Sequence, residues 1–164
     1  MPKGVFTEHK NTMLSLEDQP REHDTVWSNQ TTGIMYHFDE SRNKWLSAKK
    51  DKFEFARKGS SDGMYIPLLG DLDDVEDVYG SEKDATITGI WCRSKSGNNY
   101  KVFQIHVNGV NVYQFGYTGT RLYINNNLDI DIANEDTVQI YVMDSGTPVR
   151  NTVCRLGYSW RYDV

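Results

Sequence analysis

The sequence lacks any long apolar run, and this absence limits what the protein can be. A helix that crosses a bilayer needs about 18 or more consecutive apolar residues, and no segment of the 164-residue chain approaches that length. The N-terminus leads from Met1–Gly4 into polar sequence without the apolar core of a secretory signal. We therefore expect a soluble protein with no membrane partner.

Positive charge is also scarce. Lys and Arg number 18 against 23 Asp and Glu, which gives a formal net charge of -5. Proteins that bind nucleic acid without sequence preference use clustered Lys and Arg to displace counterions from the phosphates. Because no basic stripe is visible along the chain, we expect no nucleic-acid partner.

Cysteine is equally scarce. Cys92 and Cys154 are the only two, each lies in a strand-like run, and neither has a Cys or His neighbour at metal-ligand spacing. Disulfides form mainly in oxidising compartments, and the chain shows no secretory signal. We predict two buried free thiols, with a disulfide as the alternative, and neither a bound metal nor another cofactor.

The chain length fits one compact domain with an arm, because domains commonly hold about 100 to 150 residues. Residues 1–23 are polar around the apolar trio Met13, Leu14 and Leu16, which is too little apolar surface to offset the entropy of ordering. Two interpretations stand: an arm that attaches to a partner, or a frayed terminus. Residues 24–164 form the domain, and aromatic residues, 12% of the chain, supply much of its small core.

Short alternating segments between turn residues predict antiparallel strands in the first part of this domain. Three short runs lie at Thr25–Trp27, Ile34–Phe38 and Lys44–Leu46. A fourth, at 52–57, places Phe53 and Phe55 on one face. We interpret residues 24–58 as a small meander, followed by a turn-rich acidic boundary at 59–83.

The boundary is most acidic at residues 71–77, which hold five carboxylates. Carboxylates can ligate calcium, but their spacing here departs from that of an EF-hand loop, so we expect a solvated loop and no metal site. Leu72, Val75 and either Val78 or Tyr79 have helical spacing, which predicts one short helix.

Residues 84–164 carry the strongest strand pattern and are predicted to form the main sandwich. Asn108-Gly109 predicts a type I′ turn between the runs 101–107 and 110–115, because that turn needs positive φ at both positions. Further alternating faces are Thr86/Thr88/Ile90/Cys92, Phe103/Ile105/Val107, Leu128/Ile130/Ile132, Val138/Ile140/Val142 and Cys154/Leu156/Tyr158/Trp160/Tyr162. Strands of this length and spacing predict an all-β fold, a β-sandwich or jelly roll.

No arrangement of catalytic residues stands out. Two histidines fall in the polar arm and two, His37 and His106, in strand-like runs, and no known nucleophile motif is present. Asp129 and Asp131 share one strand face, as a pair of glycosidase carboxylates would. Charges on a solvent-facing strand also discourage edge pairing, and we favour that explanation. The sequence therefore predicts no catalytic residues and no enzyme.

One group of residues is a candidate surface for a glycan or a protein partner. Tyr113, Tyr117 and Tyr123 lie near the run Asn125-Asn126-Asn127, and Asn126 is at its centre. Tyrosine rings can stack on sugars while asparagine bonds hydroxyl groups. The alternative is that these rings belong to the sheet core or to a subunit interface, for which tyrosine is equally suited.

Several strand-and-turn segments occur together along the chain: Thr32–Tyr36, Arg42–Ser47, Phe53–Arg57, Ala85–Ile90, the turn Val107–Gly109 and Leu156–Arg161. In this order they resemble short β-rich proteins of tailed bacteriophages, over roughly residues 25–162. The resemblance brings with it no catalytic residue.

This resemblance implies a virion structural component: a head-decoration or head-fibre protein, or a tail or tail-fibre module, commonly trimeric. Such a protein is made in the host cytoplasm and carried on the virion, and the arm of residues 1–23 would attach it to other virion proteins. No heptad or collagen-like shaft is present, which favours a compact decoration or tip module. A glycan-binding or receptor-binding module that contacts a host-surface glycan is the runner-up, and an enzyme fragment or inhibitor is a third hypothesis.

Overall fold

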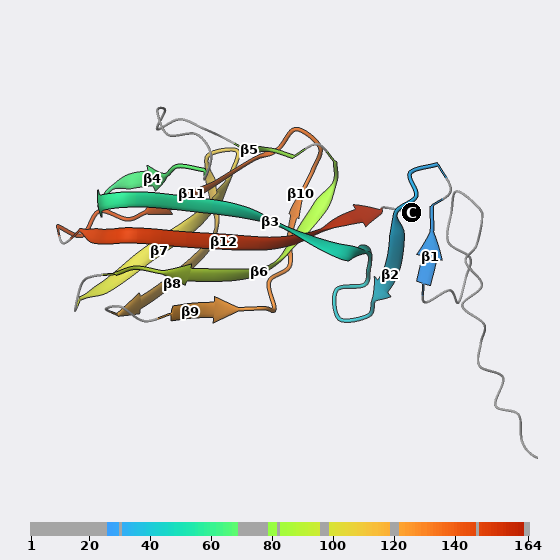
Figure 1. Cartoon of the computed structure of the whole chain (residues 1–164), viewed down its shortest axis with the longest axis horizontal. Coiled ribbons are helices and arrows are strands. Elements are labelled where there is room, and N and C mark those ends of the chain that lie inside the picture. The colour runs from blue at the N-terminus through green and yellow to red at the C-terminus, as the bar shows by residue number, and fades with distance from the viewer. Residues whose placement is uncertain are drawn as a thin grey trace, which may run out of the picture.

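The computed structural model describes residues 26–29, 31–68, 79–81, 83–95, 99–118, 122–146 and 148–162, and every regular element in these ranges is a β-strand. The strands form two antiparallel sheets (Figure 1). The all-β prediction is confirmed, with the sheets arranged as a sandwich. No helix occurs in these ranges, and so none that is long and apolar enough to cross a bilayer.

Three expectations fall partly or wholly outside the described residues. They are the arm of residues 1–23, the acidic run 71–77 and the short helix expected around it. Only Tyr79 of that helix is described, and it lies in a strand, β5 (Tyr79–Gly80).

Sheet A has the strand order β1-β2-β3-β12-β6-β10, and β9 pairs with the same edge of β6 as β10. The two longest strands, β3 and β12, pair from Trp45 opposite Tyr162 to Ser61 opposite Val149. The runs expected at 44–46 and 52–57 are parts of β3, so the first meander continues directly into the main sheet. The strand bounds are β1 Val26–Ser28, β2 Met35–Asp39, β3 Lys44–Ser61, β6 Ala85–Arg93, β9 Leu122–Asn125, β10 Ile130–Ile132 and β12 Val149–Tyr162.

Sheet B has the order β4-β11-β7-β8, with β5 beside β4 along β11. The predicted turn at Asn108-Gly109 joins β7 to β8, and its φ angles of 52° and 75° confirm the left-handed backbone that this turn needs. The strand bounds are β4 Met64–Ile66, β7 Tyr100–Val107, β8 Val110–Thr118 and β11 Thr137–Val142.

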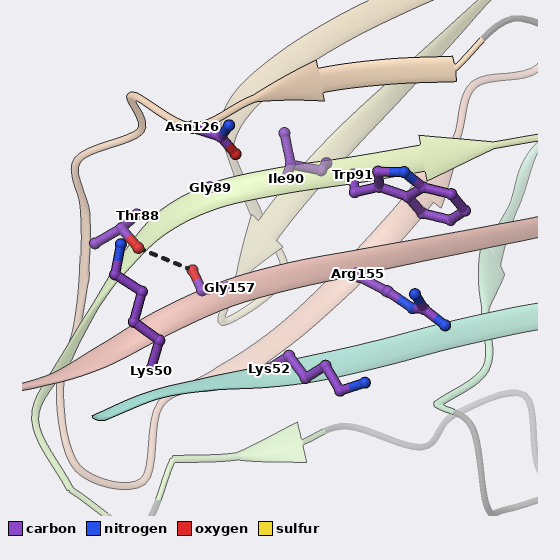
Figure 2. Close-up of a pocket in the computed structure, with 9 residues that line it drawn as sticks. All are labelled: Lys50, Lys52, Thr88, Gly89, Ile90, Trp91, Asn126, Arg155 and Gly157. Atoms are coloured by element: carbon purple, nitrogen blue, oxygen red, sulfur yellow. Dashed lines mark hydrogen bonds between the residues drawn. The ribbon is translucent and has the colours of Figure 1, made fainter. Parts of the chain in front are cut away.

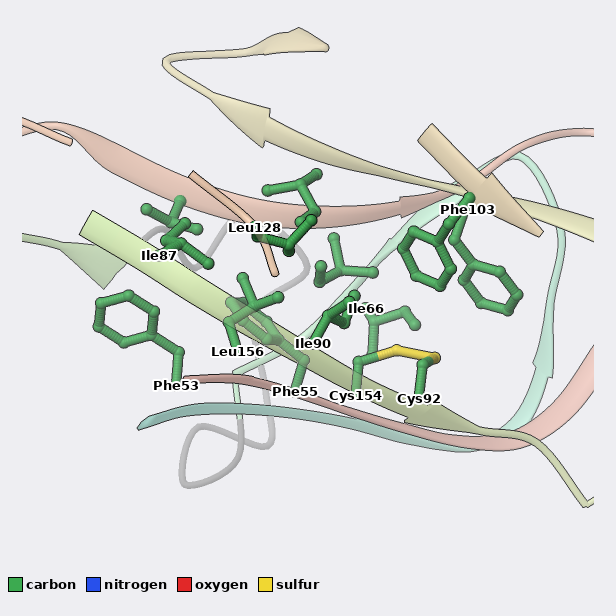
Figure 3. Close-up of a cluster of buried hydrophobic side chains, with 14 of the residues drawn as sticks. Phe53, Phe55, Ile66, Ile87, Ile90, Cys92, Phe103, Leu128, Cys154 and Leu156 are labelled. Atoms are coloured by element: carbon green, nitrogen blue, oxygen red, sulfur yellow. A yellow bond between two sulfur atoms is a disulfide. The ribbon is translucent and has the colours of Figure 1, made fainter. Parts of the chain in front are cut away.

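The main core lies between the two sheets (Figure 3). Sheet A contributes Phe53, Phe55 and Leu156, and sheet B contributes Phe103 and Ile105, all of them almost fully buried. Burying a side chain of this size stabilises a fold by about 1.5–3 kcal/mol. The faces that alternation predicts for β3, β7 and β12 are therefore the faces that build the core.

A second, aromatic cluster lies at one end of sheet A. Trp27 of β1 is fully buried against Tyr36 of β2 and Trp45 of β3. The Tyr162 ring, near the end of β12, is 4.6 Å from the Trp27 ring between centroids. The described chain therefore enters at β1 and leaves at β12 on the same side of the molecule, which we call the aromatic pole (Figure 1).

The prediction for β6 needs one correction. Strict alternation places Thr86, Thr88, Ile90 and Cys92 on one face, but the pairing with β12 shifts by one residue at Thr88. Such a bulge reverses the alternation of the strand, so Ile87 joins Ile90 and Cys92 in the core. All four residues are still buried, because the threonines lie in the interior of the sheet.

The cysteine prediction was right about burial and wrong about the thiols. Cys92 on β6 and Cys154 on β12 are directly opposite each other, with Cα atoms 4.1 Å apart, and they form a disulfide. Both are fully buried. Their separation of 62 residues in sequence hid this register, which only the β6–β12 pairing establishes.

Candidate binding surface

The outer face of sheet A is hollowed where two glycines meet. Gly89 of β6 is opposite Gly157 of β12, and a Cβ atom added to Gly157 would have no heavy atom within 4 Å. The resulting groove has a volume of about 260 Å³ and is bordered by Lys50, Lys52 and Trp91 (Figure 2). Thr88, Ile90, Asn126, Arg155 and the two glycines complete its lining, and we call it the glycine groove.

Strand alternation brings the cations of this groove together. Lys50 and Lys52 are two residues apart on β3, and Arg155 is two residues before Gly157 on β12, so all three point outward. Glu54 partly neutralises them, because its Oε1 accepts from Lys52 Nζ at 2.9 Å and from Arg155 Nε at 2.6 Å. The hydrogen bond from Lys52 and the charge of Arg155 lower the pKa of Glu54.

Trp91 separates the glycine groove from a second groove. The guanidinium of Arg155 lies 5.2 Å from the centre of the Trp91 ring, a cation–π contact that holds the two side chains together. On its other side Trp91 borders the second groove, of about 520 Å³, which Arg93, Lys95 and Asn151 also line. Two cationic hollows therefore flank one tryptophan.

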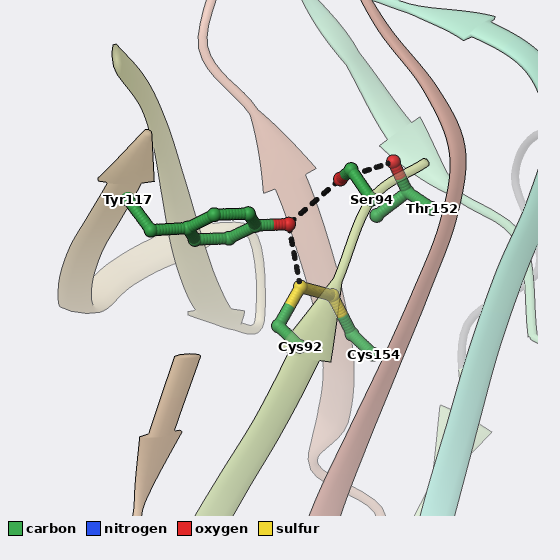
Figure 4. The surroundings of a disulfide bond; sticks show 5 residues. All are labelled: Cys92, Ser94, Tyr117, Thr152 and Cys154. Carbon is green, nitrogen blue, oxygen red and sulfur yellow. Dashed lines mark hydrogen bonds between the residues drawn. A yellow bond between two sulfur atoms is a disulfide. The ribbon is translucent and has the colours of Figure 1, made fainter. Parts of the chain in front are cut away.

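The structure separates the residues that the sequence proposed as a glycan surface. Tyr117 lies in the core and is 7% exposed, where its hydroxyl bonds Ser94 Oγ at 2.7 Å and touches Cys92 Sγ at 3.6 Å (Figure 4). Ser94 in turn bonds Thr152 at 3.0 Å. Burial raises the pKa of Tyr117 to about 12. Tyr117 thus supports the disulfide region and offers no surface to a ligand.

Tyr113 and Tyr123 are half-buried and bond to each other. Their hydroxyl oxygens are 2.9 Å apart, and Asn125 Nδ2 donates to Tyr113 at 3.0 Å. Burial and the bond to Tyr113 raise the pKa of Tyr123 to about 12. This network ties β8 to β9 across the two sheets. Of the proposed residues only Asn126 is both exposed and in the glycine groove.

The two aspartates that resemble a glycosidase pair are occupied by an ion-pair network. Lys44 Nζ donates to Asp129 at 2.7 Å and to Asp131 at 2.8 Å, and Arg161 reaches Asp131 at 2.9 Å. Despite desolvation, these bonds lower the pKa of Asp131 and raise that of Lys44. The pair therefore joins β10 to β3 and β12.

His106 of β7, one of the two histidines in strands, is held by hydrogen bonds on both ring nitrogens. His106 Nδ1 and the Tyr65 hydroxyl are 3.0 Å apart, and His106 Nε2 and Gln104 Oε1 are 2.8 Å apart. Desolvation lowers the pKa of His106. Across the described ranges no group of three or more His, Cys, Asp or Glu could hold a metal ion.

Sequence reasoning missed the glycine groove. The outward positions of β12 were visible as Arg155 and Gly157, in alternation with Cys154 and Leu156. What the sequence does not contain is the register that sets Gly157 beside Gly89 and Arg155 beside Trp91.

Comparisons with known proteins place few constraints on this chain. No protein-family model matches it, and no curated protein matches it. Among solved structures it is similar to one described under the words "Bacillus endospore appendages form a novel family of disulfide-linked pili", with 11% sequence identity and a TM-score of 0.38. The match covers 68% of this chain and 87% of that chain.

Proposed function

We propose that the protein is a structural component of a tailed-bacteriophage particle, a compact module that decorates the head or the tail. It acts by assembly and surface binding, with no reaction of its own. The support from sequence is the resemblance of residues 25–162 to short β-rich phage proteins.

The observation that carries the proposal is the contact between Trp27 and Tyr162, whose ring centroids are 4.6 Å apart. It brings the start and the end of the described domain, β1 and β12, to one pole. A module attached at that pole presents the rest of its surface outward. The opposite pole carries the end of β3, the start of β7 and the start of β12 (Figure 1).

The body between the poles is built to be stiff. β3 is 18 residues long and β12 is 14 residues long, and they pair along most of that length. The disulfide adds a covalent link between β12 and β6. A rigid, covalently tied sheet suits a protein that must keep its shape on the outside of a particle.

Self-association as a trimer belongs to the same proposal. Val110 and Val112 of β8 are 63% and 44% exposed, and Leu122 and Ile124 of β9 are 46% and 52% exposed. These strands lie at the edges of sheets B and A, where apolar side chains finish their burial against another subunit. The mass of the protein in solution, measured by light scattering at micromolar concentration, tests this part: a trimer is expected, and a monomer overturns it.

Deletion of residues 1–22 tests the attachment. We expect the shortened protein to fold and to keep the oligomeric state of the full chain, because Trp27 and the main core are intact. We also expect it to be lost from particles assembled in its presence. Full-length protein expressed in the same way is the control, and equal incorporation of both forms would contradict the proposal.

Glycan binding is the second candidate, and one observation favours it: the cationic glycine groove beside Trp91. It occupies a different surface from the tyrosines that the sequence singled out.

A further inference from the structure

The side chains that line the two grooves beside Trp91 carry a charge opposite to that of the whole chain. Five cationic side chains line the two grooves beside Trp91, and no carboxylate does, although the chain carries a net charge of -5. Lys50, Arg93 and Lys95 form no ion pair within the described ranges. A cationic surface on an acidic protein calls for an anionic occupant.

Glu54 leaves much of this charge available. It is the carboxylate bonded to Lys52 and to Arg155, and it engages the guanidinium of Arg155 through Nε. Because that ion pair uses Nε, the two terminal nitrogens of Arg155 are left as donors to which a carboxylate or sulfate group can bond. The glycine groove therefore keeps two donors that an anion can use, Lys50 and Arg155.

The floor and the wall of the grooves favour a ring-shaped ligand. Gly157 leaves the sheet surface bare of a side chain, so a ligand can approach the backbone there, whereas Gly89 beside it is buried under Asn125 and Asn126. Trp91 rises beside this floor with a partly exposed ring. Asn126 on one side and Asn151 on the other offer amide groups to hydroxyls. The apolar ring of Trp91, the open floor at Gly157 and the neighbouring amide groups together suit the binding of a sugar ring.

Trp91 lines both grooves, so one long ligand could occupy the two grooves together. A single small anion would occupy only one of them. We propose that the face formed by the glycine groove and the second groove binds a linear acidic polysaccharide, whose carboxylate or sulfate groups contact Lys50, Arg155, Arg93 and Lys95 while a sugar ring lies against Trp91.

Single-stranded nucleic acid is the other linear polyanion, and the aromatic content argues against it. Proteins that hold single strands stack successive bases on several aromatic rings. Trp91 is the one aromatic residue that lines either groove in the described structure. The nucleic acid therefore serves as a competitor in the test.

The test is a titration of the folded full-length protein with four probes: a heparin oligosaccharide, a polygalacturonate oligosaccharide, neutral dextran and single-stranded DNA. Heparin carries sulfate groups and polygalacturonate carries carboxylates, and both can bind the same cations. Comparing the two affinities shows which anionic group the site prefers. We expect at least one acidic glycan to bind with an affinity that falls as salt is raised, and at least about tenfold more tightly than dextran or DNA. Equal binding of dextran, tighter binding of DNA, or no binding of either acidic glycan overturns the proposal.

Variants locate the site. Gly157→Val fills the groove without altering its charge, and we expect it to weaken binding at least about tenfold. Lys50→Ala and Lys95→Ala each remove one exposed cation and should weaken binding about two- to fivefold. Lys49→Ala is the matched control, because Lys49 is 81% exposed and lines neither groove.

Unchanged affinity of a folded Gly157→Val protein would overturn the assignment, as would an equal loss in Lys49→Ala. If Gly157→Val does not fold, Lys50→Ala and Lys95→Ala test the assignment instead, and unchanged affinity in both would overturn it. The inference does not depend on the particle role, since a protein absent from particles could still bind the glycan.

Discussion

Cys92 and Cys154 are directly opposite each other on β6 and β12, and their disulfide closes a separation of 62 residues. A cross-link of this span stabilises a protein by about 2–4 kcal/mol, mainly by restricting the unfolded chain. We expect reduction to lower the free energy of unfolding by that amount, measured by urea denaturation with and without reductant. Two thiols that label at once in the denatured, unreduced protein would show that the bond is absent.

Tyr117 predicts a loss of stability at alkaline pH. Its pKa is raised from 10.0 to about 12 in the folded protein, so the native state holds this proton more tightly than the unfolded chain does. The stabilisation is complete below pH 10 and is lost as the pH rises from 10 to about 12.

Tyr117→Phe should therefore flatten part of the alkaline decline, because Tyr123 and Tyr36, whose pKa values burial also raises, account for the rest. At neutral pH the variant loses the bond to Ser94, which costs about 0.5–1.5 kcal/mol. Urea midpoints across the alkaline range measure both effects. Tyr100→Phe is the control, because Tyr100 is 61% exposed; an identical pH profile for both variants would refute this prediction.

Trp27 should stabilise the strands at the aromatic pole more than it stabilises the rest of the fold. Trp27→Ala empties the centre of the cluster with Tyr36, Trp45 and Tyr162, and truncation of a buried tryptophan costs about 3–5 kcal/mol. We expect hydrogen exchange to accelerate in β1 and β2 while β7 keeps its protection. Met35→Ala, at a position 45% exposed on β2, should change little. Uniform loss of protection across both sheets would contradict a separate cluster.

The Lys44 network predicts a change in acid sensitivity. The lowered pKa of Asp131 contributes stability that is present above its unfolded value, about 3.9, and is lost as the pH falls through the folded pKa. Lys44→Met should raise the pKa of Asp131, followed by carboxyl NMR, and cost about 0.2–1 kcal/mol near neutral pH. Lys49→Met is the control, and an unmoved Asp131 titration would exclude the coupling.

Local pattern accounts for much of the fold that the sequence predicted. Asn108-Gly109 forms its turn because two adjacent residues suffice to favour positive φ. Phe53, Phe55, Phe103 and Ile105 were assigned to buried faces because alternation is a property of the single strand.

Pairing between distant strands accounts for what the sequence did not predict. The bulge at Thr88, the disulfide and the glycine groove all depend on how β6 aligns with β12. Nothing within either segment alone sets that alignment, because a shift of one residue would preserve the composition of both strands while reversing one of them. The buried site of Tyr117 has the same origin, since its partners Ser94 and Thr152 come from two other segments.

The most direct test of the central claim is quantitative mass spectrometry of phage particles purified through a density gradient. The particle role predicts peptides from residues 26–162 in the particle fraction, at a constant ratio to the major capsid or tail protein and in a copy number divisible by three. Recovery of the protein only from the soluble fraction of the lysate, with none on the particles, would contradict it.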